Sequence, residues 1–192
     1  MKRQILLLAI FIIISQIAFC QTAKISSREE NDEMLTIGTC YTMVKMDNQQ
    51  ELGPSVCYRY DKRNGLKTFY LCFWIRTYEY NRISKFGIDK GAKVIIKTRK
   101  GSVITAVNRF KDYNYSTDGE LHSGGQIYKL LTAYEIEKAD LDTIVQEGIT
   151  KVRFETTCGF RDYYSEKSNA LGELIASQCD LIQGKENFSE GF

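Results

Sequence analysis

The chain has 192 residues, with 26 lysines and arginines against 24 aspartates and glutamates and a formal charge of +2 at pH 7. This length suffices for one ordinary domain with a full hydrophobic core. The nearly neutral balance argues against a nucleic-acid partner, because such proteins bind largely through an excess of positive charge.

The first twenty residues have the pattern of a secretory signal peptide. A basic Met-Lys-Arg start precedes an apolar run over residues 5–14, which is shorter than the roughly 20 residues that cross a bilayer. We expect cleavage between Cys20 and Gln21, so that the mature protein is periplasmic, on the cell surface or extracellular. The alternative is a lipoprotein acylated at Cys20. Phe19 argues against it, because the residue before an acylated cysteine is normally small.

The rest of the chain predicts one domain. Residues 21–34 are polar and acidic and are expected to form a flexible leader. A single β-rich domain is expected over residues 35–183, beginning with a strand over residues 35–46, and residues 184–192 form a tail. We expect no second domain.

Aromatic and β-branched residues make Thr68–Tyr80 the expected central strand, with apolar side chains on both faces. The Asn64–Gly65 dipeptide predicts a two-residue hairpin turn that joins it to a strand over residues 55–63. Counting outward from that turn places Cys57 opposite Cys72. We expect either a disulfide between them or two small buried cysteines side by side.

A second hairpin is predicted over residues 92–109, with its turn at Lys100–Gly101. Turn-forming residues make 113–125 a long exposed loop. Counting outward from the second turn gives one apolar face, made of Val94, Ile96, Thr98, Val103, Thr105 and Val107.

The C-terminal part predicts a strand over 126–136, a helix over Lys138–Glu147 that stops at Gly148, and a strand through Val152–Thr156 with one wet face. A loop over 158–167 is expected next. The closing amphipathic helix follows, with its apolar positions at Leu171, Leu174, Ile175, Cys179 and Ile182.

These elements indicate an α+β domain that is mainly antiparallel β. About seven strands must curl into a sandwich or partial barrel to bury the central strand, with a short helix before the last strand and a C-terminal helix packed on the sheet. The pattern that runs from Tyr134 through Asp140-Leu141 and Gly148-Ile149 to Phe154, in the last third of the chain, resembles the C-terminal half of small, uncharacterised exported β-rich proteins of Gram-negative bacteria. That resemblance implies a fold and no function.

Positive charge is concentrated in the middle of the chain. Residues 59–111 hold fourteen lysines and arginines against three acids, and residues 112–192 hold seven against fifteen. Exposed tyrosines beside arginines suit a binding surface, and the simpler interpretation is a set of solvated strand edges. The candidate binding residues are Arg76, Tyr78, Tyr80, Arg82, Lys97, Arg99 and Lys100.

We therefore expect a non-catalytic binding module for an unknown protein or glycan, recognising an anionic glycan or an acidic protein, with a membrane contact only if Cys20 is acylated. Phosphate-loop, nucleophile-elbow and zinc-spacing patterns are missing, so we expect no cofactor, no metal and no enzymatic activity. One alternative is a hydrolase with Cys158 as nucleophile and His122 as base. We expect Cys158 instead to pack against Cys179 or to form a disulfide with it, and that disulfide would remove the hydrolase site. Another is a structural or assembly subunit.

Overall fold

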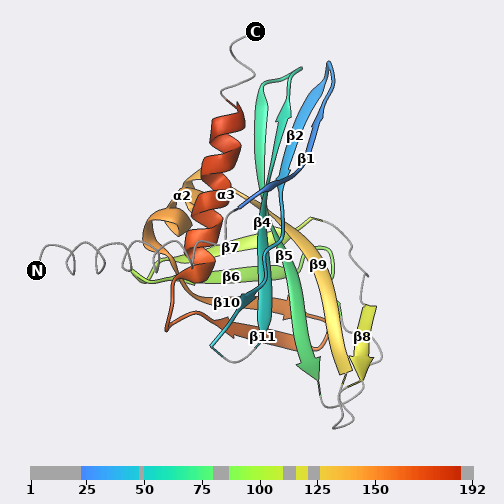
Figure 1. Ribbon diagram of the computed structural model, residues 1–192, viewed down its shortest axis with the longest axis vertical. Coiled ribbons are helices and arrows are strands. Elements are labelled where there is room, and N and C mark those ends of the chain that lie inside the picture. Colours follow the sequence, from blue (N-terminus) through green and yellow to red (C-terminus); the bar gives the residue numbers. More distant parts are fainter. Residues whose placement is uncertain (1–22, 48–49, 80–86, 110–115, 121–125, 187–192) are drawn as a thin grey trace, which may run out of the picture.

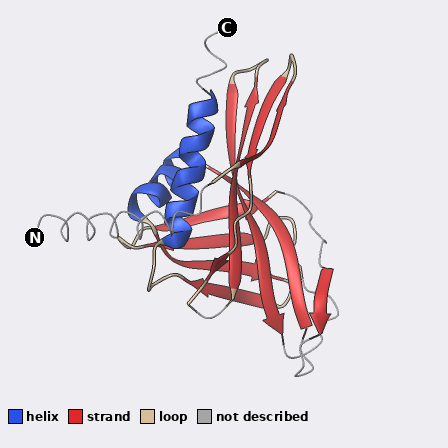
Figure 2. Ribbon diagram, in the orientation of Figure 1, coloured by secondary structure: helices blue, strands red, loops and turns tan. Residues whose placement is uncertain are grey.

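The computed structural model describes residues 23–47, 50–79, 87–109, 116–120 and 126–186 (Figure 1). These residues form eleven strands and two helices, labelled as in Figure 1 and coloured by type in Figure 2. The strands are β1 Ile25–Glu30, β2 Met34–Thr39, β3 Val44–Lys45, β4 Glu51–Asp61, β5 Leu66–Glu79, β6 Lys93–Thr98, β7 Val103–Asn108, β8 Ser116–Glu120, β9 Gln126–Ile136, β10 Ile149–Thr156 and β11 Gly159–Tyr164. The helices are α2 Lys138–Glu147 and α3 Ala170–Glu186.

All the strands belong to one antiparallel sheet. Its order is β1-β2-β4-β5-β9-β7-β6-β10-β11, with β3 paired to β4 and β8 paired to β9. Strands β4, β5 and β9 run along the length of the molecule, whereas β6, β7, β10 and β11 run across it (Figure 1). The sheet therefore bends sharply between β9 and β7 without closing into a barrel.

An aromatic cluster lies inside the bend. The rings of Phe73 on β5 and Phe154 on β10 lie 5.1 Å apart and nearly perpendicular, although three strands separate them in the sheet. Tyr134 and Tyr163 pack against Phe154 from β9 and β11, and all four side chains are buried. The sheet thus curls until two separate parts of its inner face pack against each other. The prediction of an α+β domain that is mainly antiparallel β is confirmed.

The two helices cover the open side of the curl (Figure 2). Helix α3 packs against β4, β2 and α2. Its fully buried Gln178 donates from Nε2 to the carbonyls of Cys40 and Pro54, at 3.1 and 3.0 Å. Pro54 lies in the part of β4 between its pairing with β3, which ends at Leu52, and its pairing with β2, which begins at Cys57. A proline without an N–H suits that gap, and Gln178 supplies the donor that its carbonyl needs.

The predictions for β9 and α2 are confirmed to the residue. Helix α2 ends because Gly148 adopts φ 71° and its N–H bonds the Ile144 carbonyl at 2.9 Å. The Asn169 side chain leaves no room for a Cβ at Gly148, and its Oδ1 accepts the N–H of Ile149 at 3.2 Å. This contact ties the end of α2 to the start of α3.

The predicted register of the first hairpin is wrong by two residues. The loop spans four residues, Lys62–Gly65, because the Asp61 carboxylate accepts the N–H of Arg63 at 2.9 Å and the amide of Asn64 at 3.1 Å. Asp61 therefore pairs with Leu66 as the last rung. A shift of two keeps every side chain on its expected face.

The predicted register of the second hairpin is wrong by one residue, which exchanges the two faces of β7. Its turn holds three residues, 99–101, since Thr98 bonds Ser102 at 2.9 Å and Gly101 adopts φ 98°. Ile104 and Ala106 therefore face the core in place of Val103, which is 64% exposed.

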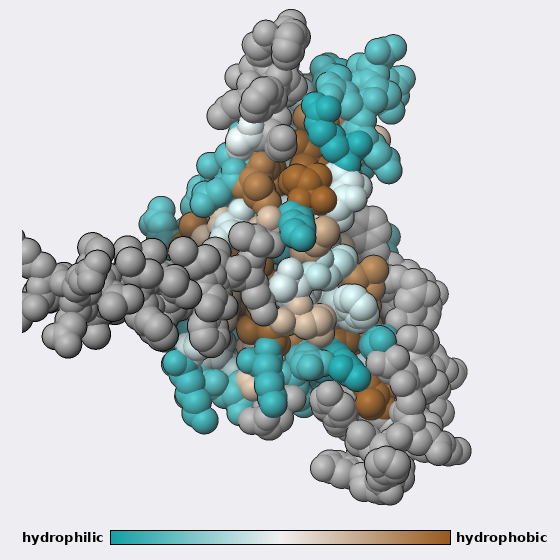
Figure 3. All heavy atoms as spheres, viewed as in Figure 1, coloured by the Kyte–Doolittle hydropathy of each residue, from teal (hydrophilic) through white to brown (hydrophobic). Residues whose placement is uncertain are grey.

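Three segments expected to lack regular structure form strands. Residues 25–30, predicted as flexible leader, form β1, and residues 159–164, predicted as loop, form β11. Strand β8 lies inside the predicted 113–125 loop. Strand β1 carries almost only exposed polar side chains, and hydrophilic residues cover the free end of its hairpin with β2 (Figure 3). Such edge strands pair through the backbone and leave little hydrophobic pattern in the sequence.

Candidate functional site

The central strand β5 has one covered face and one open face. On the inner face, Phe69, Leu71, Phe73 and Ile75 are buried. On the outer face Cys72 is buried, but Trp74 is 36% exposed, so the prediction that both faces are buried is only partly correct. The physical reason is that the curl and the helices cover the inner face, whereas the outer face is left largely to solvent.

Trp74 forms an apolar pair with its neighbour on β9. Leu131 lies directly opposite it in the sheet and is 40% exposed. The ring of Tyr41 meets the indole edge-on at 6.4 Å between centroids, and Lys129 Nζ lies over the indole at 5.6 Å. The tryptophan is therefore fixed by two neighbours while part of its surface remains in water.

Charged side chains lie on the same face of the sheet as this pair. Arg76 is two residues from Trp74 on β5, and Arg59 lies further away, opposite Thr68. Arg76 Nη1 bonds the Glu51 carboxylate at 2.7 Å, and Arg109 Nε bonds Glu135 at 3.0 Å. Arg59 is exposed on β4, and it forms no ion pair with any residue that the structure describes. Glu51 and Glu135 are thus engaged by arginines of this chain.

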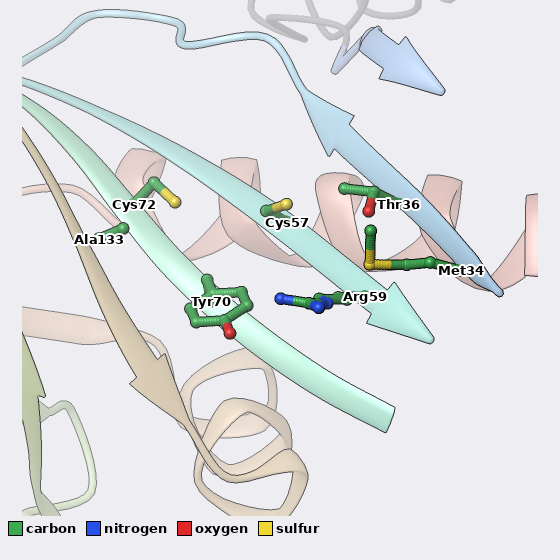
Figure 4. Close-up of a pocket in the computed structure, with 7 residues that line it drawn as sticks. All are labelled: Met34, Thr36, Cys57, Arg59, Tyr70, Cys72 and Ala133. Atoms are coloured by element: carbon green, nitrogen blue, oxygen red, sulfur yellow. The ribbon is translucent and has the colours of Figure 1, made fainter. Parts of the chain in front are cut away.

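A shallow hollow of about 250 Å³ lies on the same face (Figure 4). It begins at Cys72 and Ala133, which are two residues from Trp74 and Leu131 along β5 and β9. Its walls come from the outer faces of β2, β4, β5 and β9. Cys57 and Cys72 contribute thiols from adjacent strands, while Arg59 and Tyr70 lie side by side (Figure 4). The lining residues are Met34, Thr36, Cys57, Arg59, Tyr70, Cys72 and Ala133.

The thiols of the hollow are held neutral. Burial raises the pKa of Cys72 to about 12 against an opposing hydrogen bond from Tyr41, and burial also raises the pKa of Cys57. A protonated thiol is a poor nucleophile and a poor metal ligand. The described residues hold no group of three or more His, Cys, Asp or Glu that could bind a metal ion.

The five described cysteines are all free, so neither expected disulfide is formed. In the observed register Cys57 faces Tyr70 and Cys72 faces Ser55, which puts the two thiols on a diagonal. Cys158 lies in the turn between β10 and β11, and Cys179 is buried on α3. Burial raises the pKa of Cys179 to about 12.

Three of the other predicted binding residues have side chains in the described part of the chain, and they are placed away from Arg76. Lys97, Arg99 and Lys100 lie at the β6–β7 turn, at the opposite end of β7 from Asn108, where β7 pairs with β9. Arg99 Nη2 donates to the Ser165 carbonyl at 2.8 Å and so fixes the turn against the segment before α3. Tyr80, Arg82, His122 and the side chain of Tyr78 lie outside the described residues.

The sequence analysis did not identify Leu131, Lys129 or Arg59 as site residues. The strand that holds Leu131 was predicted correctly, and its alternation alone places Leu131 on the face opposite to Tyr134. The sequence does not say which of the two faces stays open.

Comparisons of the chain with protein-family models, with curated proteins and with solved structures found no match. The site is therefore interpreted from its own geometry. Within the described ranges, neither helix has the length and apolar character that crossing a membrane requires.

The raised thiol pKa values predict slow alkylation of the folded protein. With a pKa near 12, roughly one Cys72 thiol in ten thousand is ionised at about pH 8. We expect iodoacetamide to modify the half-buried Cys158 well before Cys72 and Cys179 in the native protein, and all five at similar rates in denaturant. Peptide mass spectrometry of timed samples measures the rates. Fast labelling of Cys72 in the native protein would contradict its buried position in the sheet.

Proposed function

We propose that this protein is a non-catalytic binding module that recognises an acidic segment of a partner protein. The recognition surface consists of Trp74, Leu131, Lys129, Arg59 and the adjoining hollow, hereafter the Trp74 surface. The exposed Trp74–Leu131 pair is the observation that carries the proposal, because partly buried tryptophans bordered by polar groups dominate the energetics of protein interfaces.

The charge around the pair supports an acidic partner. Glu51 and Glu135 are engaged by arginines of this chain, whereas the Arg59 guanidinium meets no carboxylate among the described residues. A carboxylate of the partner at Arg59 would gain a charge-assisted hydrogen bond at the rim of an apolar hollow. An adjacent apolar side chain would enter that hollow.

A protein segment suits the Trp74 surface better than a sugar. Trp74 is only 36% exposed, with Lys129 Nζ over the indole and the Tyr41 ring packed against it, so little of the indole is open for stacking a sugar ring. The hollow has the size of a side-chain pocket and is lined mainly by apolar groups.

Two other functions remain proposals with less support. A hydrolase would need a reactive thiol at Cys158, and a structural subunit would need a tether at Cys20. Neither proposal has an observation in the described residues comparable to the Trp74–Leu131 pair.

Selection from a random peptide library displayed on phage tests the proposal. We expect enriched peptides to combine an apolar residue with aspartate or glutamate and to lose about tenfold or more in affinity against Trp74→Ala. Val103→Ala is the control, since Val103 is also an exposed apolar residue, at 64%, and lies on another part of the sheet. Enrichment that is independent of Trp74 would overturn the assignment of this surface.

We further infer that the mature protein is exported and begins at Gln21, which the signal-peptide pattern of residues 1–20 supports. Mass spectrometry of the N-terminus, on protein recovered from cells that express the full chain, is expected to find Gln21 first. An N-terminus at Met1 would refute export by this route. A diacylated Cys20 would instead support the tethered-subunit alternative.

A further inference from the structure

A second feature of the outer surface lies on β6, β10 and β11. There Lys97 of β6 is directly opposite Lys151 of β10, and Arg153 projects from the same face of β10 two residues further on. Like charges placed directly opposite each other in a sheet repel and destabilise it. Such an arrangement is retained at a cost, and an anion placed between the two ammonium groups would remove that cost.

One carboxylate serves two of these three cations. Asp162 of β11 accepts two bonds from Arg153, at 2.6 and 2.8 Å, and one from Lys151 at 2.7 Å. These contacts hold the pKa of Asp162 well below its usual range. Lys97 forms no ion pair with any residue in the described ranges. The shared carboxylate therefore orients the cations without neutralising the group.

Aromatic rings lie beside the same cations. Lys151 Nζ is 4.9 Å from the centre of the Tyr164 ring, and Arg153 Cζ is 5.4 Å from the Phe160 ring. Phe160 is 56% exposed, which is unusual for so large an apolar side chain. The Arg153 guanidinium lies over one face of the Phe160 ring, and the part of the ring that stays exposed beside these cations can contact a ligand that is both anionic and flat on one apolar side.

We propose that this face of β6, β10 and β11 binds an anionic polysaccharide. A sulfate or carboxylate group would lie between Lys97 and Lys151, and a sugar ring would stack on Phe160. The proposal is independent of the Trp74 surface, because that surface ends at β9 and β7 lies between β9 and β6 in the sheet order.

A polysaccharide fits this face better than an acidic peptide does. Peptides gain affinity from side-chain pockets or from pairing with a sheet edge. The hollow lies beside Trp74, and although β11 is the last strand of the sheet, the cations here project from the face of the sheet and not along that edge. An extended chain with regularly repeated charges can lie across such a face without a pocket.

Binding of three polyanions to the purified mature protein tests this proposal: heparin, polygalacturonate and poly-glutamate. We expect heparin or polygalacturonate to bind more tightly than poly-glutamate of equal charge. Lys97→Glu should weaken that binding by about tenfold or more. It should also lower the slope of log Kd against log salt concentration by about one to two, because that slope counts the ionic contacts that are made. Phe160→Ala should weaken the binding without changing the salt dependence.

Lys24→Glu is the matched control, because Lys24 is exposed and lies near the far end of the sheet. An equal loss in Lys24→Glu and Lys97→Glu would overturn the proposal, since only net charge would then matter. Tighter binding of poly-glutamate would overturn it in favour of an acidic protein. Trp74→Ala should leave polysaccharide binding unchanged. A failure of the polysaccharide proposal can therefore be distinguished from a failure of the proposed binding at the Trp74 surface.

Discussion

The contact between Phe73 and Phe154 determines the arrangement of the whole molecule. The two rings belong to strands that are not neighbours, and their 5.1 Å separation requires the sheet to bend through β9, β7 and β6. Bending gives the sheet a concave inner face filled by aromatic and aliphatic side chains. It also leaves a convex outer face, on which every outward side chain of β4, β5, β9, β6 and β10 must find other partners or remain in water.

Both proposed binding surfaces are consequences of that outer face. Around β5 the outward residues are apolar beside arginines, and the result is the Trp74 surface. Around β10 and β11 they include Lys151, Arg153 and aromatic rings, with Asp162 as the shared acid and Glu155 accepting the N–H of Lys93. Burial keeps the Cys57 and Cys72 thiols protonated, so the hollow is suited to packing against a ligand and not to reacting with one.

Secondary structure could be predicted where a strong hydrophobic periodicity was followed by a residue that clearly ends the element. Strand β9 and helix α2 were predicted to the residue because alternation changes to helical spacing after Ile136 and Gly148 ends the helix. Register could not be predicted, since it depends on how many residues each turn holds. The Asp61 side chain and the positive φ of Gly101 set those numbers through local bonds that composition does not reveal. Polar edge strands gave no periodic signal at all.

The candidate site was predicted less well, for a related reason. The sequence indicated Arg76 and the apolar character of β5, but the exposure of Trp74 depends on which elements cover each face. Arg99 was predicted as a binding residue, whereas its guanidinium holds the β6–β7 turn against the Ser165 carbonyl.

A double-mutant cycle between Phe73→Leu and Phe154→Leu, followed by urea denaturation, tests the curl most directly. The account predicts a coupling free energy of about 1 kcal/mol between the two positions. A parallel cycle between Trp74→Leu and Phe154→Leu should be additive, because those side chains lie on opposite faces of the sheet. Additivity in the Phe73–Phe154 cycle within about 0.3 kcal/mol would contradict the curl and the two outer surfaces that follow from it.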